Sequence, residues 1–550
     1  MNHRILRPLL PVLVAALPFA GQSQGIMGTS IHGNFQFDGQ YYVPDSAIGA
    51  AETPPEKFLN NAFANFNYES THFLAGLRYE SYLNPILGFD QQYQGSGIPF
   101  RYFTFRNDKA EVTVGNFYEQ FGSGLVFRSY EERSLGIDNA MDGVRIKYMP
   151  VQGLYLKGVV GRQRYYFDHG EGILRGGDAE LNFNEAFSSM AENKTKIILG
   201  GSFISKFEAD NDPDYVLPEN VGCGSGRINI QNGGWQLLGE YAHKINDPNG
   251  SNGKIYKNGN AMLVTLGYTQ KGFGATLAGK RIDNMSFHSE RDVTTNALTI
   301  NYLPALTKNH TNLLPAIYPY ATQPNGEMAM QAEFFFNLKP GSSGGGKYGT
   351  DVNVNYSRAQ DIDRQNINDT LGYTSDFFKV GDEIFFEDFN VEVNKKWSKS
   401  VRTIISYVYI NYNKDVIEGR DGFGHVYSHT GIVETIWKLT SKKTLRTELQ
   451  HLYTKQDQQN WAVVLAEYTV APKWSIAAFD EYNYGNKHQD ANGNYDSRIH
   501  YYTGTIAFTN NANRFSIGYG RQRAGILCVG GVCRNVPASN GVTFSVTSSF

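Results

Sequence analysis

Cysteine is scarce in this sequence, long apolar runs are missing from its interior, and its charges nearly cancel. Three Cys among 550 residues are too few for a disulfide scaffold or a Cys-rich zinc module. No internal run of about 18 apolar residues occurs, which excludes a helical membrane protein. A formal net charge of -3 gives no electrostatic basis for nucleic-acid binding, so we expect no nucleic-acid partner.

Aromatic residues, in contrast, are abundant. Phe, Tyr and Trp make up 14% of the chain, far more than a disordered chain would carry. The protein therefore buries aromatic surface in a folded structure.

The first 23 residues differ from the rest. Arg4 and Arg7 precede an apolar stretch at residues 9–20, and small residues follow up to Ser23. This order predicts a secretory signal peptide over residues 1–23, which leaves residues 24–550 as the exported protein. About 12 apolar residues interrupted by proline are too few to span a bilayer.

Strict alternation of apolar and polar residues is the commonest pattern beyond the signal. Residues 144–148, 352–356, 389–394 and 445–450 all show it. Because successive side chains of a strand point to opposite faces, each segment is predicted to be a strand with one apolar and one polar face. Such strands fit either a soluble sandwich or a transmembrane barrel with a wet lumen.

The lengths of the connections favour the barrel. Very short joins, such as 69–70, 270–271 and 511–512, alternate with long irregular stretches. Those stretches are residues 83–97, 118–141, 165–178, 207–225, 284–325, 358–383, 413–427 and 486–498. Outer-membrane barrels have short periplasmic turns and long external loops, whereas a sandwich has no reason to sort its connections in this way.

Aromatic residues near the predicted strand ends point the same way, because Tyr and Trp rings favour the membrane interface. We expect two girdles that include Tyr407, Tyr409, Tyr453, Trp461, Trp474, Tyr482, Tyr484, Tyr501 and Tyr502.

The chain ends on an alternating segment, residues 542–550, whose last residue is Phe550. This ending resembles the signal that the barrel-assembly machinery of the outer membrane reads. We therefore expect that machinery to be a partner during insertion, and outer-membrane lipid to be a permanent one.

The fold prediction is all-β: a single large antiparallel transmembrane β-barrel of about 24 strands (22 to 26) in the cell outer membrane. Segments 179–184 and 226–231 are the weakest strands, and residues 294–302 are a further candidate strand.

A barrel of this size encloses a wide lumen that something should obstruct. No plug domain of more than about a hundred residues precedes the first strand, so inward-folded loops are the main candidates. Loop 284–325 is one, because it is apolar and rich in proline. It is either a plug or docking loop or an unrecognised strand pair. Its candidate residues are Leu303, Leu306, Leu313, Leu314, Ile317, Tyr318 and Tyr320.

Loop 118–141 is the second candidate, because it mixes Arg with carboxylates. Folded into the lumen, these groups would form either a charged constriction or a structural ion-pair cluster. The residues are Glu119, Arg128, Glu131, Arg133, Asp138 and Arg145.

Four short runs carry a resemblance to a known family. They are residues 58–61 (FLNN), 115–124 (GNFYEQFGSG), 136–139 (GIDN) and 318–320 (YPY). Through these four runs, the chain resembles an uncharacterised family of outer-membrane barrels from Bacteroidota. The resemblance covers the whole mature chain. The resemblance brings no ligand or catalytic residue. It implies that other outer-membrane subunits are candidate partners, because some large barrels of that phylum belong to secretion or assembly complexes.

Motifs for chemistry are scarce. Gly-x-Ser-x-Gly is not found at a strand-to-helix turn, and the His residues form no HExxH motif. We therefore expect no enzyme activity, cofactor or metal. Cys528 and Cys533 flank a Gly-centred tip, so export predicts a disulfide there. Cys223 is then unpaired, and it is predicted to be extracellular with the other two.

Two functions stay open. The polar lumen face favours a channel for small hydrophilic solutes with a loop-obstructed lumen. The wide barrel, the apolar loop 284–325 and the family resemblance favour a non-transporting scaffold or accessory subunit of an outer-membrane assembly or secretion complex. The lumen face is predicted from Glu111, Arg145, Lys147, Glu240, Arg446, Glu448 and Gln450.

Overall fold

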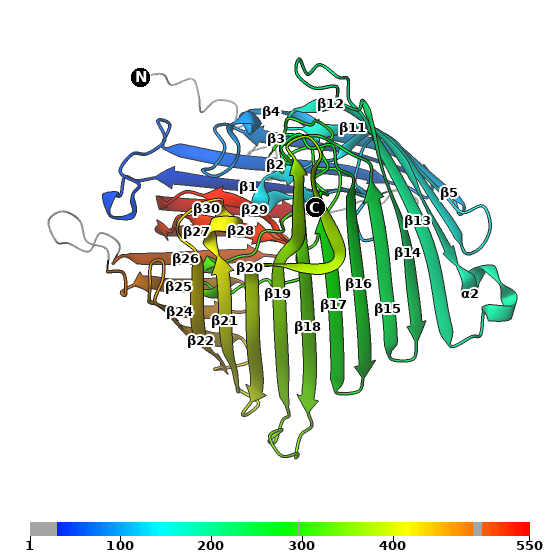
Figure 1. The fold of residues 1–550 in the computed structure, drawn as a ribbon. Helices are drawn as coiled ribbons and strands as arrows, with labels where there is room; N and C mark the ends of the chain where they lie inside the picture. Colours follow the sequence, from blue (N-terminus) through cyan, green and yellow to red (C-terminus); the bar gives the residue numbers. More distant parts are fainter. Residues whose placement is uncertain (1–29, 295, 488–497) are drawn as a thin grey trace.

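The computed structural model describes residues 30–294, 296–487 and 498–550, so the predicted signal peptide lies outside the described residues. Twenty-four strands form one antiparallel sheet, in which each strand pairs with the next strand of the wall. The sheet closes where β30 pairs with both β27 and β1. Closure removes the free edges, as a sheet surrounded by lipid requires (Figure 1).

The barrel strands are β1 (Ser30–Tyr42), β2 (Phe58–Glu69), β3 (Phe73–Tyr82), β4 (Gly95–Arg106), β5 (Ala110–Phe117), β10 (Met141–Tyr148), β11 (Leu154–Tyr165), β12 (Asp168–Asn182), β13 (Thr195–Phe207), β14 (Asn220–Asn232), β15 (Trp235–Lys244), β16 (Gly259–Gln270), β17 (Phe273–Asp283), β18 (Gly326–Leu338), β19 (Thr350–Asn368), β20 (Gly372–Lys396), β21 (Val401–Asn413), β22 (His425–Lys438), β23 (Lys443–Thr454), β24 (Trp461–Val470), β25 (Trp474–Asn483), β26 (His500–Asn510), β27 (Asn513–Gln522) and β30 (Ser539–Ser549).

Shorter elements lie in the connections. They are β6 (Glu119–Phe121), β7 (Phe127–Ser129), β8 (Glu131–Glu132), β9 (Ile137–Asp138), β28 (Gly525–Val529), β29 (Val532–Val536), the helices α2 (Phe183–Ala186) and α3 (Lys414–Glu418), and the 3-10 turns η2 (Ser46–Ile48), η3 (Gln91–Tyr93), η4 (Arg133–Leu135), η5 (Ser188–Met190) and η6 (Pro315–Ile317). None of the helices in the described ranges has the length and apolar character needed to cross a membrane.

The two ends of the barrel differ in their connections. Ser30 pairs with Glu69, and Gly33 exchanges backbone hydrogen bonds with Phe550, so the start of β1 and the C-terminal residue lie on the side of the short turns. That side is the periplasmic one. Two of its connections, residues 183–194 and 339–349, are longer than the turns that the sequence suggested.

Several predicted external loops are partly strand. β12 begins at Asp168 and β14 at Asn220, inside stretches expected to be irregular. The largest correction concerns residues 358–383, where β19 and β20 continue as a long hairpin up to a three-residue turn. Polar residues in these stretches hid the strands, because strands beyond the membrane need no apolar face.

Side chains of the wall alternate between lipid and lumen. Val114, Ile146, Ile405, Leu449 and Val464 point outward and are exposed. An apolar outward face on a closed barrel is stable only in lipid. The protein is therefore an integral outer-membrane β-barrel.

Inward-facing side chains show a gradient along the barrel axis. On β22, Val426, Thr430 and Ile432 are buried, Glu434 is half-buried, and Lys438 at the periplasmic end is exposed. On β23 the inward residues from Thr454 to Glu448 are buried, and Arg446 and Thr444 toward the periplasmic end are half-buried. The outer half of the lumen is thus filled with protein, whereas the periplasmic half is open to water.

Three predictions were wrong: the positions of two aromatic residues and of one cysteine. Trp461 and Tyr501, expected in the girdles, point into the lumen and stack with ring centroids 6.0 Å apart. Cys223 does not lie in an external loop, because it is buried on the lumen side of β14. Alternation of apolar and polar residues shows that a strand has two faces. It does not show whether an aromatic ring or a thiol near the end of a strand faces the lipid or the lumen.

Candidate functional site: the loop-filled lumen

Two segments fill the outer half of the lumen: residues 118–140, between β5 and β10, and residues 284–325, between β17 and β18. They bond to each other, because the amide of Arg128 donates to the carbonyl of Ile300 and the side-chain amide of Asn139 donates to the carbonyl of Thr299. In the described part of 284–325, strand pairing is limited to one bridge between His288 and Thr299. No additional strand pair, and no strand over 294–302, is formed there.

An apolar core joins both segments to one side of the wall. We call it the first lumen cluster. Its loop members include Phe121, Leu125, Val126, Phe127, Met285, Phe287 and Ile300, and its wall members include Val159, Leu174, Ile204, Val221, Cys223, Ala242, Ala261 and Ile282. The segment 118–140 is also pinned by Glu240 of β15, which accepts a 2.7 Å hydrogen bond from the amide of Ser123.

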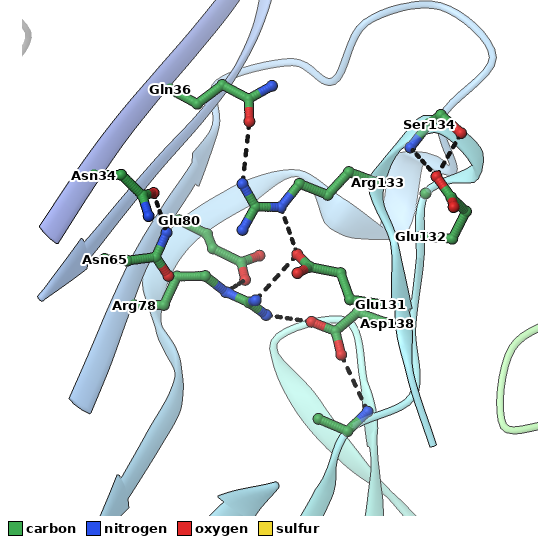
Figure 2. Close-up of polar contacts among 12 residues, drawn as sticks. Asn34, Gln36, Asn65, Arg78, Glu80, Glu131, Glu132, Arg133, Ser134 and Asp138 are labelled. Carbon is green, nitrogen blue, oxygen red and sulfur yellow. Dashed lines mark hydrogen bonds and ion pairs between the residues drawn. The ribbon is translucent and has the colours of Figure 1, made fainter. Parts of the chain in front are cut away.

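A buried ion-pair cluster also holds this segment to β3 and β11 of the wall (Figure 2). Arg78 of β3 bonds Glu80 at 2.6 Å, Glu131 at 3.0 Å and also Asp138. Arg164 of β11 bonds Glu80 at 2.7 Å and Asp138 at 2.6 Å. The loop carboxylates therefore lock residues 131–138 against the wall.

Arg133 lies at the edge of this cluster. Its guanidinium donates to Glu131 at 2.6 Å and to Gln36 of β1 at 3.1 Å. Three of the predicted charged residues, Glu131, Arg133 and Asp138, are thus brought together. Their main partners, Arg78, Glu80 and Arg164, were not singled out from the sequence. Arg78 and Glu80 have inward register on β3. Arg164, in contrast, has the parity of the outward Val160 on β11 and follows a register shift between Arg162 and Arg164.

The other three predicted charged residues lie apart from that cluster. Glu119 bonds Lys157 at 2.9 Å and lies 3.6 Å from Arg145. Burial alone would raise the pKa of Glu119, but hydrogen bonds and nearby lysines outweigh it and lower the pKa. Arg128 stacks between the rings of Tyr130 and Tyr302, with its guanidinium carbon 4.4 and 4.1 Å from their centroids.

Residues 304–322 of the second segment cross to the far wall, which they meet through polar groups. Lys308 donates to Asn390 at 3.2 Å, and His310 lies 2.5 Å from Asp388, both on β20. On β23, the side-chain amide of Asn312 donates to Glu448 at 3.2 Å and the backbone amide of Leu314 donates to Gln450 at 2.9 Å.

An apolar core, the second lumen cluster, surrounds these contacts. It contains Leu306, Leu314, Tyr318 and Tyr320 together with wall residues such as Phe386, Val408, Ile410, Tyr412, Trp461 and Val463, and Leu313 and Ile317 pack against it. Leu303 instead packs against the first cluster. Burial raises the pKa values of Tyr318 and Tyr320, whose hydroxyl groups donate to Asp457 and Glu327.

The crossing segment has a narrow neck, held by the external hairpin β28–β29. Ala305 donates its amide to the carbonyl of Gly530 at 3.3 Å, and Thr322 donates its amide to Gly531 at 3.0 Å. A Cβ on Gly531 would approach both Ala305 and Thr322, so the two ends of the segment lie side by side. Cys528 and Cys533 form a disulfide across this tip.

Reduction of the disulfide is expected to loosen the neck, because the tip that accepts both amides loses its covalent constraint. Peptides covering residues 303–322 should exchange amide hydrogens about tenfold faster in reduced protein, since exchange follows local opening. Deuterium uptake measured by mass spectrometry checks this, with residues 425–438 of the wall as the unaffected control. Equal uptake with and without reductant would contradict it.

A cavity of about 430 Å³ remains beside the crossing segment. Thr311, Leu313 and Ala316 line one side of it, and the hairpin residues Ile526 and Leu527 lie across it. The wall side consists of Gln40, Phe479, Glu481, Thr503, Gly520, Gln522 and Thr543. None of the fully buried members of the two lumen clusters comes from the described residues of β25, β26, β27, β30 or β1.

The sequence was compared with the models of known protein families. Residues 3–550 match the model of a family described as a family of unknown function, DUF6029. The chain belongs to this family. No curated protein has a significantly similar sequence to this DUF6029 barrel.

Three solved structures resemble the DUF6029 barrel. The siderophore receptor PirA from Pseudomonas aeruginosa is 8% identical, with a TM-score of 0.39 over 94% of this chain and 80% of that chain. OpdL from Pseudomonas aeruginosa is 11% identical, with a TM-score of 0.39 over 78% and 100%. Wzi from Escherichia coli, a carbohydrate-binding barrel involved in capsule assembly, is 10% identical, with a TM-score of 0.35 over 73% and 83%.

No metal centre is formed by the residues that the structure describes, because no three His, Cys, Asp or Glu side chains gather in a suitable arrangement. The chemistry available in the lumen is that of hydroxyl, amide and paired charged groups.

Proposed function

We propose that the DUF6029 barrel is a gated outer-membrane channel for small hydrophilic solutes, closed by its two lumen segments. The observation that carries this proposal is the uncovered strip of inner wall along β25, β26, β27, β30 and β1, where the cavity lies. The apolar clusters and the buried ion pairs cover other parts of the inner wall in the outer half of the lumen.

Polar groups line much of the strip. Thr543 and Gln522 point inward and are exposed, and below them so are Thr547 and Arg514. A solute from the periplasmic half can thus reach the cavity along hydroxyl and amide groups, which replace part of its hydration. The hairpin β28–β29 closes the route toward the outside.

The charges around the cavity balance each other. Glu481 lies 3.3 Å from Arg523, and Arg521 bonds Asp45 at 2.6 Å. Because no net field of one sign is present, we expect weak selectivity between anions and cations.

A bulky side chain in the strip is expected to block the route. Thr543→Trp should lower single-channel conductance severalfold in planar bilayers under reducing conditions, because the indole would occupy the passage. Phe544→Trp is the matched control, since Phe544 faces the lipid. Undiminished conductance in the Thr543→Trp variant would show that solutes take another route.

One observation favours a second candidate, a non-transporting scaffold or accessory subunit. The first lumen cluster contains seventeen buried residues from loops and wall, an arrangement typical of a permanent core. The resemblance to Bacteroidota barrels, which stays a prediction, points the same way. Silence in bilayers together with a stable complex that co-purifies in gentle detergent would favour the scaffold.

A further inference from the structure

The hairpin formed by the outer ends of β19 and β20 is separate from the lumen. These strands have 19 and 25 residues, whereas their neighbours β18 and β21 have 13 each. The hairpin therefore extends beyond the rim of the barrel. Its register is irregular: Ile362 pairs with Val380 and Arg364 pairs with Ser375, so residues 376–379 bulge out of β20.

The hairpin folds onto the outer surface of the wall. Arg281 of β17 is outward, because it lies four residues from the exposed, lipid-facing Leu277 and so shares its face of the strand. It donates to Ser375 at 2.8 Å, and Tyr373 donates to the outward Asp283 at 2.7 Å. Charged groups on the outward face are unfavourable in lipid. The hairpin covers this pair, and Arg281 is 1% exposed.

The bulge sits at the level of the external aromatic girdle. The ring of Phe377 lies 6.2 Å from that of Tyr241, an outward residue near the external end of β15. Tyr427 and Tyr453 are also outward and lie near the external ends of β22 and β23. Such rings mark the boundary between headgroups and acyl chains.

The ring of Phe378 packs edge-to-face on that of Phe377, with ring centroids 5.0 Å apart. Phe378 is 83% exposed, and Val380 next to the bulge is 51% exposed.

Lys379 bonds Asp376 at 2.6 Å and lies 3.9 Å from Asp363. Asp382 and Glu383 of β20 are exposed nearby, so the charges beside the ring sum to a negative value. Acidic groups repel an anionic headgroup, whereas the exposed ring itself fits apolar lipid chains.

We propose that Phe378 and Val380 contact the acyl chains of the outer leaflet, so that this hairpin is a lipid-binding arm that extends the lipid-facing surface of the barrel. Continuity with the barrel's lipid interface supports this occupant, because the bulge packs directly on outward residues of β15 and β17. The proposal goes beyond a channel function and does not depend on it.

Nitroxide labels on single-cysteine variants test the arm. Phe378→Cys and Val380→Cys are labelled without reductant in proteoliposomes of phosphatidylcholine and phosphatidylglycerol. Cys223 is buried and Cys528 is bonded to Cys533, so the native thiols do not interfere. Collision with oxygen, which concentrates in lipid, is compared with collision with a water-soluble nickel complex.

Two reference positions define the outcomes. Val464→Cys reports lipid, because Val464 faces outward in β24, and Arg420→Cys reports water, because Arg420 is exposed in an external loop. We expect the oxygen-to-nickel ratio at 378 and 380 to match that at 464. A ratio like that at 420 overturns the proposal. Low accessibility to both reagents also overturns it, because a second copy or another protein would then cover the arm.

Discussion

Removing residues 306–321 is expected to turn a closed barrel into a conducting one. The excision is feasible because Ala305 and Thr322 lie side by side on the tip of the hairpin β28–β29, so a short Gly-Ser link can join them. Because the second lumen cluster loses its loop members, the inward faces of β20 to β24 become accessible to water. Steady bilayer conductance should rise by an order of magnitude or more, since barrels of about 22 strands stay closed only when plugged.

Shortening the Gly-rich periplasmic connection 339–349 is the matched control, because it removes a similar kind of loop without touching the lumen. This variant should keep the low conductance of the wild-type protein. If the 306–321 variant folds, as heat-modifiable migration in gels would show, and yet stays silent, the crossing segment is not what closes the passage. That result would favour the scaffold.

Replacing Arg164 by Met is expected to cause the largest loss of stability. The substitution leaves Glu80 and Asp138 with one buried partner fewer, and both carboxylates are nearly inaccessible to water. Breaking a buried pair on one side costs about 3–5 kcal/mol in the free energy of unfolding, because the remaining charge is uncompensated. Urea titration of the barrel in vesicles, followed by tryptophan fluorescence, measures this loss.

Arg101→Met provides the comparison. Arg101 is more than half exposed and lies 3.4 Å from Asp142, so its loss should cost about 0–1 kcal/mol. Similar losses for the two variants would mean that the buried cluster does not hold the segment 118–140 in place. The pair of variants therefore separates a structural lock from a set of incidental contacts.

The barrel itself could be predicted from the sequence. A period of two in segments such as 144–148 and 445–450 fixes which side chains share a face, and connection length fixes which ends are periplasmic. The count of 24 strands followed, because each strand was bounded by turn residues. The prediction was wrong where this signal is weak: over residues 358–383 the register shifts several times and residues 376–379 bulge out of β20, so apolar and polar residues do not alternate regularly.

The filling of the lumen was predictable only in part. Proline and apolar residues marked 284–325 as an ordered segment, and mixed charges marked 118–141. The sequence did not supply the partners of these segments, because Arg78, Arg164, Asp388 and Gln450 are remote along the chain and look like any polar residue of a strand. Trp461 was placed in the girdle for the same reason, since its pattern fits either face.

By itself, then, the sequence determined the local periodicity, and through it a closed sheet with lipid outside and polar groups inside. Local periodicity depends only on neighbouring residues, so it can be read along one chain. Which loops enter the barrel, which wall each one meets and which strip stays uncovered were decided by the tertiary structure. The physical reason is that a buried charge or apolar ring is stable only beside a partner, and closing the barrel is what brings those partners within reach.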